Sequence, residues 1–132
     1  MMRRCLLDTD SVSFALRGVG RVGAELLKRV PSEVCISSIT LAELRYGAEC
    51  RNSRKLNALI GTFTRSIAVV PFDEAAAVEF GHLAAILRRR GTPIGVLDTM
   101  IAAHALSLDL MLVTNNTQHF SRVPKLRIEN WF

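Results

Sequence analysis

The 132-residue chain predicts an α/β fold around a central, mainly parallel sheet of about four to five strands. Short apolar runs rich in β-branched residues alternate with longer segments of helical spacing, which is typical of such folds. The sequence contains no internal repeat, low-complexity tract or domain linker. Because the length suffices for one hydrophobic core, we expect residues 1–132 to form a single domain.

Five apolar runs are expected to form the strands. They are Arg4–Asp8, Val34–Ser37, Ser66–Pro71, Leu110–Thr114 and the short terminal run Leu126–Glu129. Ligands of parallel sheets gather outside the carboxyl ends of the strands. Polar side chains that follow these runs are therefore the first candidates for a functional site.

Helical spacing fills the segments between the strands. We expect helices over Ser11–Arg17, Gly23–Val30, Thr40 to about Cys50, Arg54–Arg65, Asp73–Arg90, and Leu97 or Asp98 to about Leu108. Thr40 and Glu43 have the spacing of a capping box at the start of the third helix. The segment Gly18–Gly23 spells G-x-G-x-x-G, but a helix precedes it instead of a strand. We therefore interpret it as a connection between two helices.

Composition narrows the partners and the compartment. Seventeen Lys and Arg against twelve Asp and Glu give a net charge of +5, which favours a polyanionic partner such as nucleic acid, or only a solvated basic surface. Three cysteines without a C-x-x-C pair argue against a disulfide framework and against a zinc site. With no membrane-spanning run and no signal peptide, we expect a cytoplasmic protein.

Three carboxylates, Asp8, Glu43 and Asp98, stand where an apolar run ends or passes into a helix. A buried carboxylate is costly unless it is neutralised or paired, and no Lys or Arg is placed equally close. A divalent ion is the predicted partner, Mg²⁺ first and Mn²⁺ as a substitute, and this chemistry suits phosphodiester hydrolysis. Each acid also has a simpler reading: a turn residue for Asp8, a capping partner for Glu43, and an N-cap for Asp98.

The same acids lie in segments that resemble the motifs of a known family. Leu6–Asp10 resembles an L-D-T-N opening, and Ile36–Ala48 is similar to I-S-x-I-T-x-x-E-L-x-Y-G. The remaining motifs are Gly91–Gly95 with Asp98–Ala105, Val113–Asn116 followed by Phe120, and the ending Ile128–Trp131. Over nearly its whole length the chain resembles PIN-domain endoribonucleases, and most closely the VapC toxins of type II toxin–antitoxin pairs.

The resemblance implies a three-layer α/β/α sandwich and a Mg²⁺-dependent endoribonuclease. Asp8 and Asp98 would bind the ion, Glu43 would bind it or orient the attacking water, and Asn116 and Thr9 would position these groups. The resemblance also implies a homodimer that a VapB antitoxin neutralises. Its substrate would be a structured RNA such as tRNA, initiator tRNA included, or ribosomal RNA.

Two positions depart from the family pattern. Asp10 replaces the usual Asn, and His119 stands where the family often has a fourth acid, so the choice between one and two metal ions stays open. His119 motivates an alternative, a catalytically weak PIN domain that acts as an RNA-binding or regulatory module. A structure-specific DNA nuclease of the same fold is a further alternative. Arg45 is either an RNA contact or a solvated side chain, and His104 is interpreted as a structural histidine.

Overall fold

Short parallel strands form the centre of the molecule. The computed structural model describes residues 3–132, so Met1 and Met2 of the predicted domain lie outside it. The strands are β1 (Cys5–Leu7), β2 (Val34–Ser37), β3 (Ala68–Val70), β4 (Met111–Val113) and β5 (Ile128–Glu129). Within the described residues they form one five-stranded sheet in the order β3-β2-β1-β4-β5, and every paired neighbour is parallel. The predicted parallel sheet is confirmed.

Helices fill both sides of this sheet. They are α1 (Thr9–Arg17), α2 (Val22–Leu27), α3 (Ser38–Cys50), α4 (Arg54–Ser66), α5 (Glu74–Arg89), α6 (Val96–Ser107) and α7 (Thr117–Phe120). A 3₁₀ turn, η1 (Pro31–Glu33), precedes β2. The expected helices are present with shifted ends, whereas α7 and η1 were not predicted because elements of three or four residues are too short to show a repeating apolar pattern.

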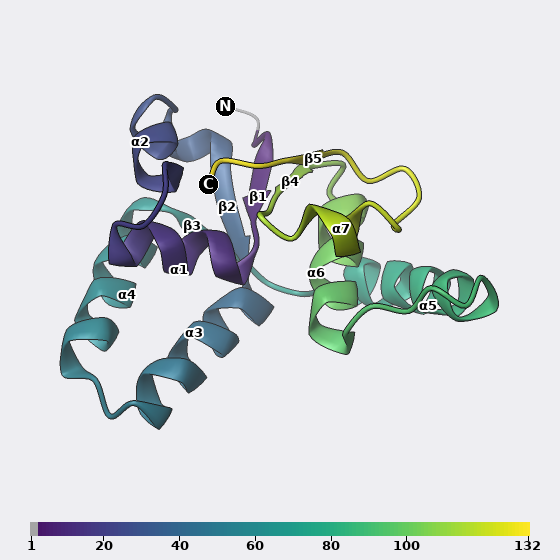
Figure 1. Cartoon of the computed structure of the whole chain (residues 1–132), viewed down its shortest axis with the longest axis horizontal. Coiled ribbons are helices and arrows are strands. Elements are labelled where there is room, and N and C mark those ends of the chain that lie inside the picture. The colour runs from purple at the N-terminus through teal and green to yellow at the C-terminus, as the bar shows by residue number, and fades with distance from the viewer. Residues whose placement is uncertain (1–2) are drawn as a thin grey trace.

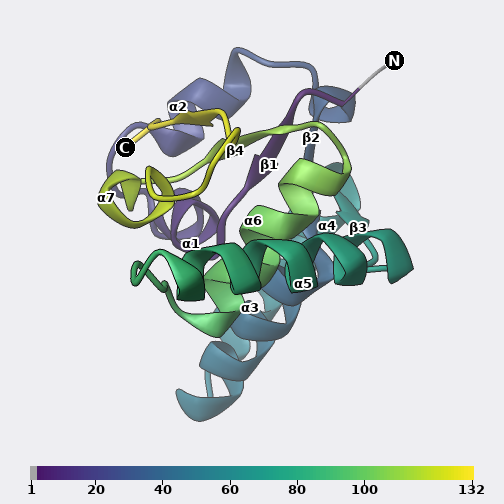
Figure 2. The same cartoon turned by 90° about the vertical axis from the view of Figure 1, so that its right-hand side faces the viewer.

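Alternation along β1 separates two hydrophobic layers. Cys5 and Leu7 face one cluster, which α1, α2, α3 and α4 complete, while Leu6 faces a second cluster made with α5, α6 and the segment around Phe120. Figure 1 shows α1, α2 and α4 on one side of the strands and α5 and α6 on the other, and Figure 2 shows α5 crossing in front of α6. These layers confirm the expected three-layer α/β/α sandwich.

Successive strands are added first on one side of β1 and then on the other, and this change determines where the candidate site lies. β2 and β3 extend from one side of β1, whereas β4 and β5 extend from the other. Such a topological switch point opens a crevice at the carboxyl ends of the two diverging strands. Here the switch point lies between β1 and β4, whose carboxyl ends are followed by Asp8 and Thr114.

Two smaller predictions are also confirmed. The glycine-rich segment joins two helices: Gly18 ends α1 in the left-handed conformation with φ of 68°, and α2 begins at Val22. Cys5, Cys35 and Cys50 are all free thiols. Among residues 3–132, no helix combines the length and apolar character needed to cross a membrane.

Candidate active site

Asp8 stands at the carboxyl end of β1 and begins the next helix. It is the N-cap of α1, and its Oδ1 accepts a hydrogen bond of 2.8 Å from the Ser11 amide. Its own amide donates to the Val113 carbonyl at 3.0 Å, which ties it to β4. Only 4% of Asp8 is exposed, and this burial raises the pKa of its carboxyl group, although hydrogen bonds from Thr114 and Ser11 oppose the rise.

Glu43 lies on α3 beside the residue that follows Asp8. The Thr9 hydroxyl, 2.6 Å from Glu43 Oε1, donates to the carboxylate, and it lies 3.1 Å from the Thr40 hydroxyl. These contacts fix α1 against α3 at the carboxyl edge of the sheet. They place Thr9 as a direct neighbour of Glu43.

The predicted capping box of Thr40 and Glu43 is wrong. Helix α3 begins at Ser38, and Ser37 is its N-cap, with its Oγ accepting from the Ile39 amide at 3.0 Å. Because a serine at the very end of β2 already supplies the cap, the helix starts before Thr40 and places that residue inside its first turns. Glu43 therefore does not take part in capping α3.

Asp98 lies in the first turn of α6, but it is not the N-cap. The helix begins at Val96 with Gly95 as its N-cap, and the Thr99 hydroxyl donates to the Gly95 carbonyl at 2.8 Å. The expectation that Asp98 caps this helix is wrong because the chain enters the helical conformation earlier, directly after Gly95. The Asp98 side chain therefore does not cap α6.

Polar residues follow β4, and one of them, His119, interacts with Asp98. Burial is the main cause that raises the pKa of the Asp98 carboxyl group, the Asp10 carboxylate raises it further, and His119 lowers it. The Asn116 amide nitrogen lies 2.9 Å from His119 Nδ1 and fixes the imidazole ring. Asp10 and His119 therefore both lie within electrostatic reach of Asp98.

The acids of this edge have no lysine or arginine as an ion-pair partner within the described residues. None of the ion pairs formed within residues 3–132 involves Asp8, Glu43 or Asp98. The donors are hard carboxylate oxygens, and two of them have raised pKa values, so their chemistry fits a hard divalent ion. In the described part of the chain, however, no three His, Cys, Asp or Glu side chains stand close enough together to hold a metal ion. The three-carboxylate ligand set thus stays a prediction.

Arg45 has a partner within the fold. Its Nη1 donates at 3.1 Å to both the carbonyl and the side-chain oxygen of Asn57, which joins α3 to α4. This nitrogen is therefore engaged in packing the helical hairpin. A contact between Arg45 and RNA stays a prediction.

Two residues at this edge, Thr114 and Tyr46, were not predicted from the sequence. Thr114 hydrogen-bonds Asp8, and the signal for it was its position directly after the β4 run. Tyr46, 74% exposed on α3, lines a cavity of about 360 Å³ together with Glu43 and Leu97. The spacing of Glu43 and Tyr46, one helical turn apart, could have indicated their shared face.

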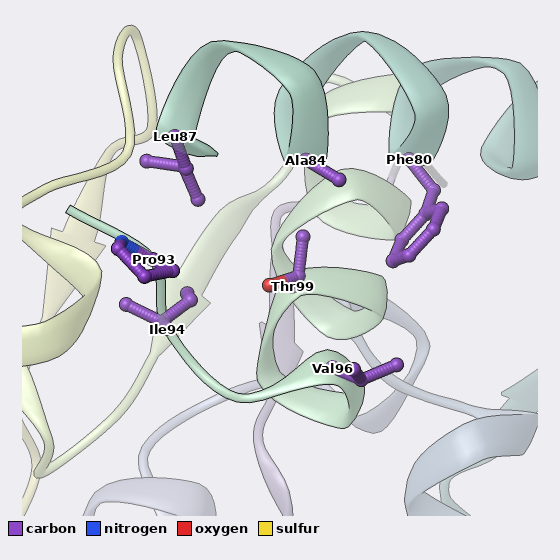
Figure 3. Close-up of a pocket in the computed structure, with 7 residues that line it drawn as sticks. All are labelled: Phe80, Ala84, Leu87, Pro93, Ile94, Val96 and Thr99. Atoms are coloured by element: carbon purple, nitrogen blue, oxygen red, sulfur yellow. The ribbon is translucent and has the colours of Figure 1, made fainter. Parts of the chain in front are cut away.

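A separate cavity of about 120 Å³ lies between α5 and the start of α6. Figure 3 shows its apolar lining, in which Phe80 and Leu87 from α5 face Pro93, Ile94 and the helix that carries Thr99. It contains no titratable side chain. This cavity therefore offers no acid–base group or carboxylate ligand of its own.

Comparisons with known proteins agree with this architecture. Residues 5–126 match the family model of the PIN domain. The tRNA(fMet)-specific endonuclease VapC of Salmonella typhimurium is 41% identical over 131 residues, which cover 98% of this chain and 99% of that protein. Ribonuclease VapC2 of Haemophilus influenzae is 40% identical over 134 residues, with the same two shares.

A solved structure agrees as well. The chain superimposes on a chain of the DNA-bound VapBC complex from Salmonella typhimurium with a TM-score of 0.89 and 41% identity, covering 99% of this chain and 100% of that one. The similarity to these relatives, in sequence and in fold, therefore extends over nearly the whole chain. The chain belongs to the PIN-domain family and, within it, to the VapC ribonucleases.

Proposed function

We propose that this chain is the toxin of a type II toxin–antitoxin pair, an endoribonuclease that hydrolyses a phosphodiester bond of initiator tRNA with Mg²⁺. One observation carries the proposal: near full-length identity of 41% to an endonuclease whose name specifies tRNA(fMet). The uncompensated acids at the switch point support it. PIN-domain nucleases generally depend on a divalent metal ion, and Mg²⁺ is the ion proposed here.

Asp8 and Asp98 would hold this ion, and Glu43 would complete the set or orient the attacking water. When bound, the ion supplies a water of lowered pKa and a positive charge opposite the phosphate. The chain contributes orientation: the Ser11 amide fixes Asp8, and the Thr9 hydroxyl fixes Glu43. Preset orientation of charged groups lowers the reorganisation needed during reaction.

The loop after β4 would support the scissile phosphate. Asn116 holds the ring of His119, which lies within reach of Asp98. With its Nδ1 held by Asn116, the imidazole would offer its other ring nitrogen to the phosphate as a hydrogen-bond donor, in place of a fixed carboxylate. Asp10 would restore part of the negative charge that the family's fourth acid supplies elsewhere.

We further propose that a VapB antitoxin neutralises the chain and that the pair acts in the cytoplasm as a heteromer of a toxin homodimer. The structural neighbour from Salmonella typhimurium is a VapBC complex, which supports this partner. A small partner that covers the acidic edge would block access of RNA to Asp8 and Asp98.

Replacing Asp98 with Asn tests the function. We expect Asp98→Asn to reduce cleavage of initiator tRNA by at least about a hundredfold, because an amide neither carries the charge nor binds Mg²⁺ as a carboxylate does. The fold should persist, since Asp98 does not cap α6. EDTA should abolish wild-type cleavage, and excess Mg²⁺ should restore it.

Controls in the same assay separate the alternatives. Glu74→Gln removes an exposed acid from the first turn of α5 and should leave cleavage unchanged. An elongator tRNA and DNA of the initiator sequence are incubated in parallel. Cleavage by Asp98→Asn at the wild-type rate would refute the proposed centre, and cleavage of DNA would favour the DNA nuclease.

His119 specifically favours the second candidate function, an RNA-binding module with little activity. That candidate predicts that wild-type chain retains initiator tRNA on a filter in Mg²⁺ or Mn²⁺ without cutting it. Rapid cleavage in either ion excludes it.

A further inference from the structure

A basic cavity of about 560 Å³ lies at the edge of the sheet opposite the acids. It is lined by Arg3 and Arg4 before β1, Arg29 after α2 and Arg127 before β5, above Cys5 and Met111. The amino end of β1, near the N label in Figure 1, borders this cavity. Four arginines from three separate parts of the chain therefore converge on one space.

Positive charge is in excess around this cavity. Asp109 is the single acid of its lining, and it lies 3.5 Å from Arg127 Nη2 at the exposed rim. Arg29 pairs with Glu25 at 3.7 Å and with Glu129 at 3.5 Å. Among residues 3–132, Arg3 and Arg4 form no ion pair. The exposed Arg127–Asp109 pair neutralises little in water, so the excess positive charge rests mainly on Arg3, Arg4 and Arg127.

Arg29 is preset for an acceptor. Its guanidinium carbon lies 4.4 Å from the centre of the Trp131 ring, and stacking of this kind fixes the plane of the group. Its Nε is buried and has no hydrogen-bond partner within the described part of the chain. A buried donor without a partner is unfavourable, and the cavity that Arg29 lines offers room for an acceptor beside its guanidinium group.

We propose that this arginine cavity binds a phosphate group. A phosphate presents several oxygens and can accept from more than one guanidinium fork at once, whereas a carboxylate has only two oxygens. The phosphate could belong to the RNA backbone or to a free nucleotide, and the first source rests on the proposed function. Arg4 and Asp8 are separated by about 13 Å along β1, so a single RNA strand that reaches both edges has to span at least this distance.

The test uses full-length Asp98→Asn chain, which prevents cleavage, and measures binding of pyrophosphate by calorimetry and of initiator tRNA by filter retention. The pocket variant carries Arg3→Gln and Arg4→Gln. The matched control carries Arg88→Gln and Arg89→Gln, which remove the same charge from the exposed end of α5. A third variant, Arg29→Lys, keeps the charge and removes the planar fork.

For the RNA backbone as source, the pocket variant should bind tRNA about tenfold more weakly and with a smaller salt dependence, while the control stays within about threefold. For a free nucleotide as source, pyrophosphate affinity should fall in the pocket variant and in Arg29→Lys, with tRNA affinity unchanged. Equal losses in pocket variant and control, or no loss with either ligand, overturn the proposal. Cleavage by the wild-type chain is read separately, so failure of the nuclease function leaves the pyrophosphate result interpretable.

Discussion

Two opposing effects act on the carboxyl group of Asp8. As N-cap of α1 it accepts from the Ser11 amide, which favours the charged form. Burial disfavours that form, and the nearby Asp10 carboxylate adds to the effect, so the pKa is raised overall. A divalent cation would resolve the conflict, and without one the residue reduces stability at neutral pH.

Asp8→Asn should therefore stabilise the metal-free protein. Asn retains an oxygen for the N-cap and carries no charge, so we expect the free energy of unfolding in EDTA at pH 7 to rise by about 1 kcal/mol. Because the folded pKa of Asp8 lies above the unfolded value of 3.8, the contribution of Asp8 to stability falls as pH rises from 3.8 through the folded pKa. The advantage of Asn should accordingly vanish below about pH 4. Urea unfolding at both pH values measures it.

Asp73 provides a matched control for this prediction. It is the N-cap of α5 and accepts from the Ala76 amide at 3.0 Å, but it is exposed. Asp73→Asn should change the unfolding free energy by less than about 0.5 kcal/mol. A destabilised Asp8→Asn protein in EDTA would show that the charged cap outweighs burial.

At the scale of elements, one buried histidine joins the helices that carry Glu43 and Asp98. His104 of α6 lies 2.8 Å through its Nδ1 from the Ser37 hydroxyl, which also caps α3. The Pro71 carbonyl accepts from the same imidazole, so the ring bridges α6, the end of β2 and the segment after β3. The interpretation of His104 as a structural histidine is confirmed.

Acid should weaken this bridge. Burial lowers the pKa of His104, although Asp73 and the bond to Pro71 oppose the shift. Because the folded pKa lies below the unfolded value of 6.5, stability is present above that value and is lost as pH falls. We expect the free energy of unfolding to fall between pH 7 and pH 5 in wild type, and to fall less steeply in His104→Gln.

Urea unfolding at pH 7, 6 and 5 gives the two slopes. His82 and His119 are present in both proteins, so their contributions cancel in the difference. Parallel slopes for wild type and His104→Gln would mean that protonation of His104 does not oppose folding.

At the scale of the whole molecule, the surface retains apolar side chains that suit self-association. Leu27 is 89% exposed, Val96 67% and Val78 55%. We expect light scattering at micromolar concentration to give twice the 14.6 kDa mass of one chain, and a larger mass after coexpression with the antitoxin. A mass of one chain at that concentration would contradict the homodimer, and an unchanged mass with the partner would contradict the antitoxin complex.

Local patterns predicted most of this architecture. The apolar runs placed all five strands to within a few residues, because strands buried in an α/β sheet need continuous apolar character. The acids and arginines at the ends of Asp73–Arg90 placed α5 almost to the residue. The starts of α3 and α6 were misplaced because Thr40 and Asp98 also suit an N-cap position. In the structure, Ser37 and Gly95 take that position instead.

The contacts between the candidate groups follow from the three-dimensional arrangement of the elements. Local sequence was enough to predict that Asp8 ends a strand and that Asp98 lies at the start of a helix, since both follow from neighbouring residues. It did not determine that Thr9 would hold Glu43, or that Arg3, Arg29 and Arg127 would share a cavity. These contacts join segments distant in the chain, so they depend on strand order and on the choice of β1 as the switch point, which local propensity does not encode.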